Sequence, residues 1–386
     1  MTRFVYADHA ATTAVSQAAL DAMLPLLQHG YGNPSSLYRF GQEAKEVLEQ
    51  ARGQIARALN AEPSEIFFTS GGTESDNWAL RGVAEARQNK GRHIITSAVE
   101  HHAILHTAAD LEKHGFEVTY LPVDADGLVS PADLKAALRP DTILVSIMAA
   151  NNEVGTIQPI RELAALAHEN GSLFHTDAVQ AVGHIPVDVK AWGVDLLSLS
   201  GHKFGGPKGV GALYLKRATP ISAFVTGGGQ ERNRRSGTEN VPGIAGMAAA
   251  LTASVGALNK EMPRLTALRD RLIAGLLTIP RSRLTGHPTQ RLPGTASVIF
   301  ECIEGESLLL RLDALGICSS TGSACSSTSL EPSHVLIAMG LPHEIAHGSL
   351  RLSLGAENTE EDVDYLIESV KTVVAQLREL SPIWAA

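Results

Sequence analysis

Glu65-Ile-Phe-Phe-Thr-Ser-Gly-Gly-Thr-Glu74 joins a short apolar run to a glycine turn and then to a segment with a helical pattern that begins near Thr73. The same order recurs through most of the chain. Strand-like runs occupy 93–96, 142–147, 173–176, 195–199 and 211–215, and further helical segments begin at His102 and Ile160. Because strands that alternate with helices form parallel sheets covered on both faces, the sequence predicts an α/β fold with a mainly parallel sheet.

The C-terminal third predicts a smaller α/β unit. An uncharged stretch at 240–259 is rich in Ala and Gly and lacks the Leu, Ile and Phe content of a membrane span, so we predict a buried core helix. A charged amphipathic helix at 260–277 would follow it and lead to strands at 295–300 and 349–353 and helices at 307–314 and 359–377. The predicted domains are a large one of residues 15–258 and a small one of residues 1–14 and 259–386.

Composition limits the classes of protein that fit. The 386 residues are 44% hydrophobic and carry a formal charge of −9, which disfavours a nucleic-acid binder. The N-terminus has no apolar core or cleavage site of a signal peptide. The three cysteines (Cys302, Cys318 and Cys325) are an odd number in a long chain, as expected of reduced thiols. We therefore predict a soluble cytoplasmic enzyme that binds neither membrane nor nucleic acid.

Two residues at predicted strand ends suggest the chemistry. Lys203 follows an apolar strand and precedes a glycine-rich turn, where partial desolvation would lower the pKa of its amine and make it a nucleophile. A surface-loop lysine is the alternative. Asp177 follows another apolar strand, and a carboxylate beside such a lysine suits pyridoxal phosphate, with the lysine as Schiff-base partner and the Asp on the ring nitrogen. A helix N-cap is the alternative for Asp177.

The glycine turn at 69–74 supplies the third part of this site. Free backbone N–H groups at the start of a helix, together with the helix dipole, bind phosphate, and the hydroxyl of Thr73 adds a donor. Ligands bind at the carboxyl edge of open parallel sheets, where all three features would meet. The combination predicts a pyridoxal-phosphate site.

With these motifs the chain resembles the class I cysteine desulfurases of the NifS and IscS type. These enzymes are fold-type I pyridoxal-phosphate transferases related to aminotransferases. The Gly322-Ser-Ala-Cys325 loop followed by Leu330-Glu-Pro-Ser-His334 distinguishes this class from plain aminotransferases. The resemblance runs through nearly the whole chain, in segments 6–13, 32–36, 69–77, 100–102, 151–155, 176–180, 200–203, 235–238, 322–325 and 351–355. It implies a large domain with a seven-stranded type of sheet and a smaller C-terminal α/β domain.

The resemblance also implies a role for each site residue. Lys203, His101 and Cys325 would be catalytic, with His101 stacked on the cofactor ring and Cys325 carrying the persulfide. The substrate carboxylate would be held by Asn33 and Arg351, and Asn152 would contact both cofactor and substrate. Cofactor contacts would come from Gly72, Thr73, His101, Asn152, Asp177, Gln180, Ser200, His202 and Lys203, and from Thr238 of the neighbouring subunit in a homodimer.

The implied activity converts L-cysteine to L-alanine and passes the sulfur from Cys325 to an acceptor, such as a scaffold for iron–sulfur cluster assembly. No intrinsic metal is implied, and any contact of Cys325 with an iron–sulfur cluster would be on the acceptor. The flanks of Cys325 are small and polar, so a loop at about 318–331 is expected to be mobile and exposed. Cys302 and Cys318 are expected to be inert, apolar-type residues.

Other readings of the same residues stay open. A selenocysteine lyase or another pyridoxal-phosphate enzyme could use this fold. A catalytically silent sulfur-transfer scaffold is an alternative of another class, although it leaves the lysine, the aspartate and the phosphate loop unexplained. The motifs are shared by nitrogenase maturation, housekeeping cluster assembly and tRNA thiolation, so they do not identify the sulfur acceptor.

Overall fold

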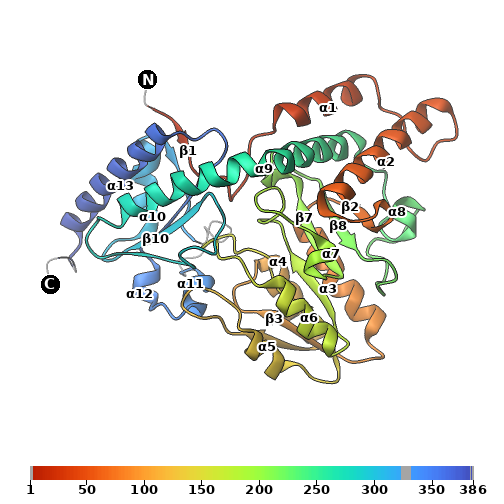
Figure 1. The fold of residues 1–386 in the computed structure, drawn as a ribbon, viewed down its shortest axis with the longest axis horizontal. Helices are drawn as coiled ribbons and strands as arrows, with labels where there is room; N and C mark the ends of the chain where they lie inside the picture. The colour runs from red at the N-terminus through yellow and green to blue at the C-terminus, as the bar shows by residue number, and fades with distance from the viewer. Residues whose placement is uncertain (1–2, 323–331, 383, 385–386) are drawn as a thin grey trace.

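The computed structural model describes residues 3–322, 332–382 and 384, and Figure 1 shows its arrangement. A seven-stranded sheet has the order β2-β8-β7-β6-β5-β3-β4. Its strands are β2 (Ile66–Thr69), β3 (His93–Ser97), β4 (Glu117–Leu121), β5 (Thr142–Ser146), β6 (Leu173–Asp177), β7 (Leu196–Ser200) and β8 (Gly211–Leu215). All neighbours pair in parallel except β8, which is antiparallel to both β2 and β7. The predicted mainly parallel α/β fold is confirmed.

Helices cover both faces of this sheet, because successive side chains of a strand point to opposite sides. Phe67 of β2 belongs to the apolar cluster formed with α3 (Gly72–Arg87) and α4 (His102–Lys113). Its neighbour Phe68 belongs instead to the cluster on the other face. That second face is covered by α2 (Arg39–Leu59), α6 (Ile160–Glu169) and the first half of α9 (Val241–Leu276). The other helices in the part of the chain that forms this sheet are α1 (Gln17–Gln28), α5 (Pro131–Ala137), α7 (Val189–Trp192) and α8 (Gln230–Asn233).

The long helix α9 differs from the expectation. The sequence predicted two helices that meet near residue 259, whereas the structure has a single helix that runs from one sheet to the other (Figure 1). Within the described residues, α9 alone is long and apolar enough to cross a membrane, but 56% of its apolar window is buried inside the protein. This burial agrees with the predicted core helix. The predicted domain boundary at 258/259 falls within α9 and stays a prediction.

A smaller sheet lies at the far end of α9. It has the order β12-β10-β9, from β9 (Ser282–Leu284), β10 (Thr295–Phe300) and β12 (Ser349–Ser353). It packs with α10 (Gly305–Ala314) and α13 (Glu360–Leu380), while α11 (His334–Ala338) and α12 (His343–Ala346) lie beside it. Near the N-terminus, β1 (Val5–Tyr6) pairs in parallel with β11 (Ile317–Cys318). The first residues of the chain therefore share an apolar core with the C-terminal third.

Candidate active site

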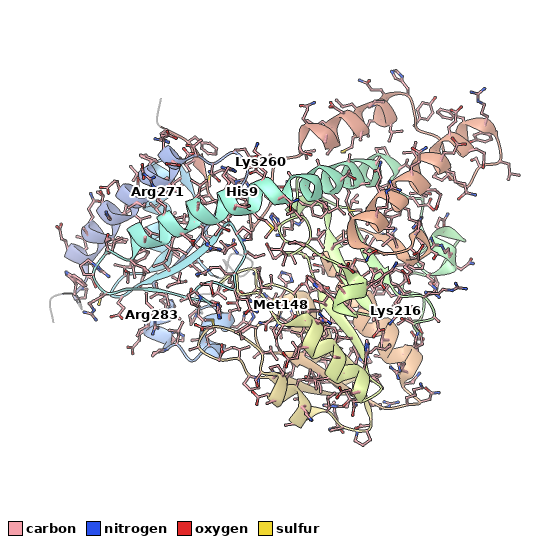
Figure 2. The ribbon with its side chains drawn as sticks, viewed as in Figure 1. His9, Met148, Lys216, Lys260, Arg271 and Arg283 are labelled. Atoms are coloured by element: carbon pink, nitrogen blue, oxygen red, sulfur yellow. The ribbon has the colours of Figure 1, made fainter. Side chains whose placement is uncertain are left out.

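The carboxyl ends of the central strands surround a cavity of about 380 Å³. β6 ends at Asp177 and β7 at Ser200, and a short 3-10 turn, η2 (Gly201–Lys203), follows β7 directly. Figure 2 shows the side chains that fill this region, with Met148 of the cavity wall labelled. The predicted site residues that line the cavity are Gly72, Thr73, His101, Asn152, Asp177, Gln180, Ser200, His202, Lys203 and Arg351.

A second cavity of about 480 Å³ lies against Lys203, Gln180 and Ala10, which it shares with the first. Its other walls include residues of α9 and of the segments 13–17, 292–295 and 353–357. Asp177, His101 and Arg351 are not among its lining residues. The smaller cavity is therefore the candidate site, since of these two cavities between described residues it is the one that combines the lysine with the predicted acid, base and carboxylate-binding groups.

Lys203 is held against the N-terminal segment of the chain. Its Nζ donates to the carbonyl oxygens of Ala10 at 2.7 Å and Ala11 at 2.8 Å. Gln180 Nε2 also donates to the Ala10 oxygen, at 2.9 Å. A surface-loop lysine, the alternative considered above, does not fit this partly buried position in the cavity wall.

Asp177 lies at the floor of the cavity with 5% of its surface exposed. Its Oδ1 accepts from the backbone N–H of Val179 at 2.9 Å. Burial raises the pKa of this carboxyl, whereas the Val179 N–H and the Lys203 ammonium lower it. Since turns rather than a helix follow Asp177, the alternative of a helix N-cap is excluded. Its position suits a partner for a cationic ring nitrogen.

His101 is the N-cap of α4, and its Nδ1 accepts from the backbone N–H of Ala103 at 3.1 Å. Burial, followed by the positive charges of His102 and Lys203, lowers the pKa of His101 to about 4. The imidazole is therefore neutral near pH 7. Because Nδ1 is an acceptor, the single proton of the neutral ring resides on Nε2.

Arg351 extends from β12 into the cavity, and its side chain is 3% exposed. Nη2 donates to Asp8 Oδ1 at 2.8 Å, and Nη1 donates to the backbone oxygen of Asn152 at 2.8 Å. Nε is buried and has no hydrogen-bond partner among the described residues. The guanidinium is thus fixed on two sides and keeps donor capacity for a carboxylate.

The turn before α3 forms a cradle of the kind that binds phosphate. A Cβ atom on Gly72 would come within 2.6 Å of Val179 Cγ2, so only glycine lets the turn approach this closely without displacing Val179. The first N–H groups of α3 have no intrahelical partner. Ser200 and His202 line the same cavity. Burial, followed by the positive charges of Lys203 and Lys208, lowers the pKa of His202 to about 4. These donors, together with Asp177 and Lys203, fit pyridoxal phosphate.

Three predicted site residues are not brought into this cavity. Asn33 lies in an exposed turn, where its Oδ1 accepts from the backbone N–H of Ser35 at 2.9 Å. Thr238 is also exposed. Cys325 lies outside the described residues, although Gly322 and His334, on either side of that segment, line the cavity.

The other two cysteines are only half-buried, whereas the sequence suggested buried apolar positions. Cys318 ends β11, and burial raises the pKa of its thiol, with Asp313 and Asp8 acting in the same direction. Cys302 is in a turn and adopts a left-handed backbone conformation with φ of 66°. Cys318 therefore forms thiolate less readily than an ordinary cysteine, as an inert residue should.

Sequence reasoning did not single out three acids at this site. Asp76 and Glu153 line the cavity, and Asp8 holds Arg351. All three lie within segments already recognised as characteristic, at 6–13, 69–77 and 151–155. Membership of those segments was the one feature of the sequence that could have indicated these acids. The sequence contains no spacing pattern that connects them with Lys203 or Arg351.

Comparison with known proteins places this site in a family. The chain matches the aminotransferase class-V family over residues 5–366. It is 59% identical to the cysteine desulfurase IscS of Methanosarcina thermophila, over 98% of this chain and 94% of the relative. It is 54% identical to that of Clostridium botulinum strain Hall, over 100% of this chain and 98% of the relative.

Solved structures agree with the sequence comparisons. A NifS-like protein superposes with a TM-score of 0.92 at 43% identity and covers 97% of this chain and 100% of its own. A structure of SspA in complex with cysteine superposes with a TM-score of 0.79 at 36% identity, over 90% of this chain and 98% of its own. The chain therefore belongs to the aminotransferase class-V family of pyridoxal-phosphate enzymes. Within that family its relatives above are cysteine desulfurases.

Proposed function

We propose that this chain is a pyridoxal-phosphate-dependent cysteine desulfurase, which converts L-cysteine to L-alanine and carries the sulfur as a persulfide on Cys325. The observation that carries the proposal is the convergence of Lys203, Asp177 and Arg351 on one cavity whose wall includes Gly322, three residues before Cys325. The names of the relatives give the same activity.

The cofactor would be held by the residues that the sequence predicted. Pyridoxal phosphate supplies an electron sink next to the amino group of a bound amino acid. Asp177 would face the ring nitrogen, and Lys203 would be the point of covalent attachment. His101 would lie on the ring, Asn152 and Gln180 would donate hydrogen bonds to its edge, and the phosphate would be bound by Gly72, Thr73, Ser200 and His202.

The protein groups then divide the reaction between them. Arg351 and Asn33 would orient the substrate carboxylate, and Asn152 would contact the substrate beside them. The Nζ of Lys203 would take the proton from the α-carbon. His101 exchanges the proton on Nε2 with the substrate. The Cys325 thiolate attacks the substrate sulfur, so that a sulfur–sulfur bond forms as the carbon–sulfur bond breaks. The overall change is L-cysteine plus thiol to L-alanine plus persulfide, which requires no external oxidant or reductant.

The working form would be a cytoplasmic homodimer. Several large apolar side chains are exposed around α1 and the start of α2, and they would be covered by a second copy: Leu24, Leu27, Tyr31, Leu37 and Tyr38. Asn33 lies within that surface, and Thr238 is exposed. Both residues would therefore act across the subunit interface, with Thr238 reaching the neighbouring phosphate. The sulfur would pass to an acceptor protein such as an iron–sulfur scaffold.

The proposed activity is tested by incubating the purified protein with L-cysteine and measuring alanine and sulfide, with and without a thiol acceptor. Alanine in amounts equal to the sulfur transferred is expected. Turnover of L-selenocysteine with none of L-cysteine would favour a selenocysteine lyase. Absence of product from either substrate in cofactor-loaded protein would favour a silent sulfur-transfer scaffold.

Arg351→Ala is expected to weaken L-cysteine binding by on the order of 1.5–3 kcal/mol, the usual loss when a charged hydrogen bond is removed. Spectral titration with L-cysteine measures this directly. Arg311→Ala is the matched control, because Arg311 is also in the C-terminal third but is exposed, donates to Gln376 and does not line the cavity. Normal binding by Arg351→Ala would place the substrate carboxylate elsewhere.

His101→Asn is expected to slow alanine production by roughly 10²–10⁴-fold, the effect of losing a positioned acid–base group. Asparagine keeps an acceptor for the Ala103 N–H, so the cap of α4 is retained and thermal stability should change little. His106→Asn, on the exposed side of the same helix, is the control. An unchanged rate in His101→Asn would restrict His101 to stacking on the ring.

A further inference from the structure

A buried turn at 151–154 connects parts of the cavity that come from distant regions of the chain. Asn151 Oδ1 accepts from the backbone N–H groups of Glu153 and Val154, each at 2.9 Å, which fixes the shape of the turn. Asn151 Nδ2 donates to the Val99 oxygen at 2.9 Å and ties the turn to the large sheet. Since the Asn152 oxygen accepts from Arg351, the turn also holds the candidate carboxylate-binding group.

Glu153, on the same turn, contacts both ends of the segment that carries Cys325. Its side chain lines the cavity, and the residue is 3% exposed. Ser333 Oγ donates to Glu153 Oε2 and also caps α11 by accepting from the N–H of Val335 at 3.1 Å. A Cβ atom on Gly322 would lie 2.6 Å from Glu153 Oε2, so the glycine backbone approaches the carboxyl directly.

A buried carboxyl is costly unless its interactions compensate for lost hydration. Burial outweighs the lowering effects of the Ser333 hydroxyl and Arg351, so that the pKa of Glu153 is raised to about 7. None of the proposed chemical steps uses this group. Its contacts are instead with Gly322 and Ser333, which lie on either side of residues 323–331 in the chain.

We infer that Glu153 is a positioning residue for sulfur transfer, which holds Ser333 by a hydrogen bond and packs against the backbone of Gly322, beside the turn that carries Asn152. This inference rests on the proposed function. The Glu153 side chain would then connect the turn that holds Arg351 with Gly322 and Ser333, which lie on either side of the segment that carries Cys325. Because a displacement of about 1 Å can slow a reaction by roughly 10²-fold, such anchoring would affect the sulfur-transfer step.

Two substitutions of Glu153 distinguish the effect of its hydrogen bond to Ser333 from the effect of its carboxylate charge. Glu153→Ala removes the acceptor for Ser333 and is expected to slow single-turnover persulfide formation by about 10–10²-fold, with the dissociation constant for L-cysteine nearly unchanged. Glu153→Gln keeps an oxygen that accepts from Ser333 and is expected to retain most of the wild-type rate. Alkylation with mass spectrometry measures the persulfide, and spectral titration measures binding.

Ser333→Ala and Ser333→Thr repeat the test from the other side of the hydrogen bond. Alanine should slow transfer as Glu153→Ala does, and threonine, which keeps a hydroxyl, should preserve it. The inference is overturned if Glu153→Ala transfers sulfur at the wild-type rate, or if Gln and Ala are equally slow, which would indicate a need for the charge. Wild-type protein that forms no alanine or persulfide would instead refute the proposed function itself.

Discussion

Lys203→Ala is expected to abolish measurable production of L-alanine from L-cysteine. Lys203 would both attach the cofactor and move the α-proton, and the loss of the proton transfer alone is worth about 10²–10⁴-fold. The Nζ atom is already positioned at the cavity wall by the Ala10 and Ala11 carbonyls. Purified wild-type protein should be yellow, and borohydride should fix the cofactor to a peptide containing Lys203.

Lys208→Ala is the matched control, since Lys208 lies in the same glycine-rich turn but is exposed and does not line the cavity. It should retain both colour and turnover. Asp177→Ala is informative beside it, because the variant should keep Lys203 but lose the buried carboxylate opposite the ring nitrogen. Mass mapping of the reduced cofactor to a different lysine, or wild-type turnover by Lys203→Ala, would contradict the assignment.

Cys325→Ser is expected to bind L-cysteine with the wild-type spectral change and yet to deliver no sulfur to an acceptor. Serine keeps the shape of the side chain but cannot form the sulfur–sulfur bond. After incubation with L-cysteine, alkylation and mass spectrometry should find the additional sulfur of the wild type on Cys325. This residue lies outside the described part of the structure, so the prediction rests on its sequence motif and on Gly322 in the cavity wall.

Cys318→Ser and Cys302→Ser provide the comparison within the same chain. Burial and two nearby carboxylates raise the pKa of Cys318, so it holds little thiolate at neutral pH. Both variants should transfer sulfur normally. Persulfide found chiefly on either of these cysteines, or full transfer by Cys325→Ser, would overturn the assignment of the carrier.

The strand ends at which the chemistry occurs could be predicted from the sequence because they depend on local signals. Apolar runs that stop at a glycine turn or at a polar residue marked the ends of β2, β6 and β7, and a parallel sheet brings such ends to one edge. The division of residues 240–277 into two helices was wrong. The change from uncharged to charged composition suggested a boundary, but the helix continues through it and past Pro263, and composition reports only which part is buried.

By itself, the sequence determined the α/β class and the placement of a lysine and an aspartate at two strand ends, since these follow from periodicity and short motifs. Cys325 as the proposed sulfur carrier was implied by the resemblance of its loop to that of the cysteine desulfurases. Only the tertiary structure decided which groups surround them. The pairing of Arg351 with Asp8, the neutral state of His101 and the contacts of Glu153 with Gly322 and Ser333 join residues that are distant in the chain. Such properties depend on burial and on the distances between charges, which arise only when the chain has folded.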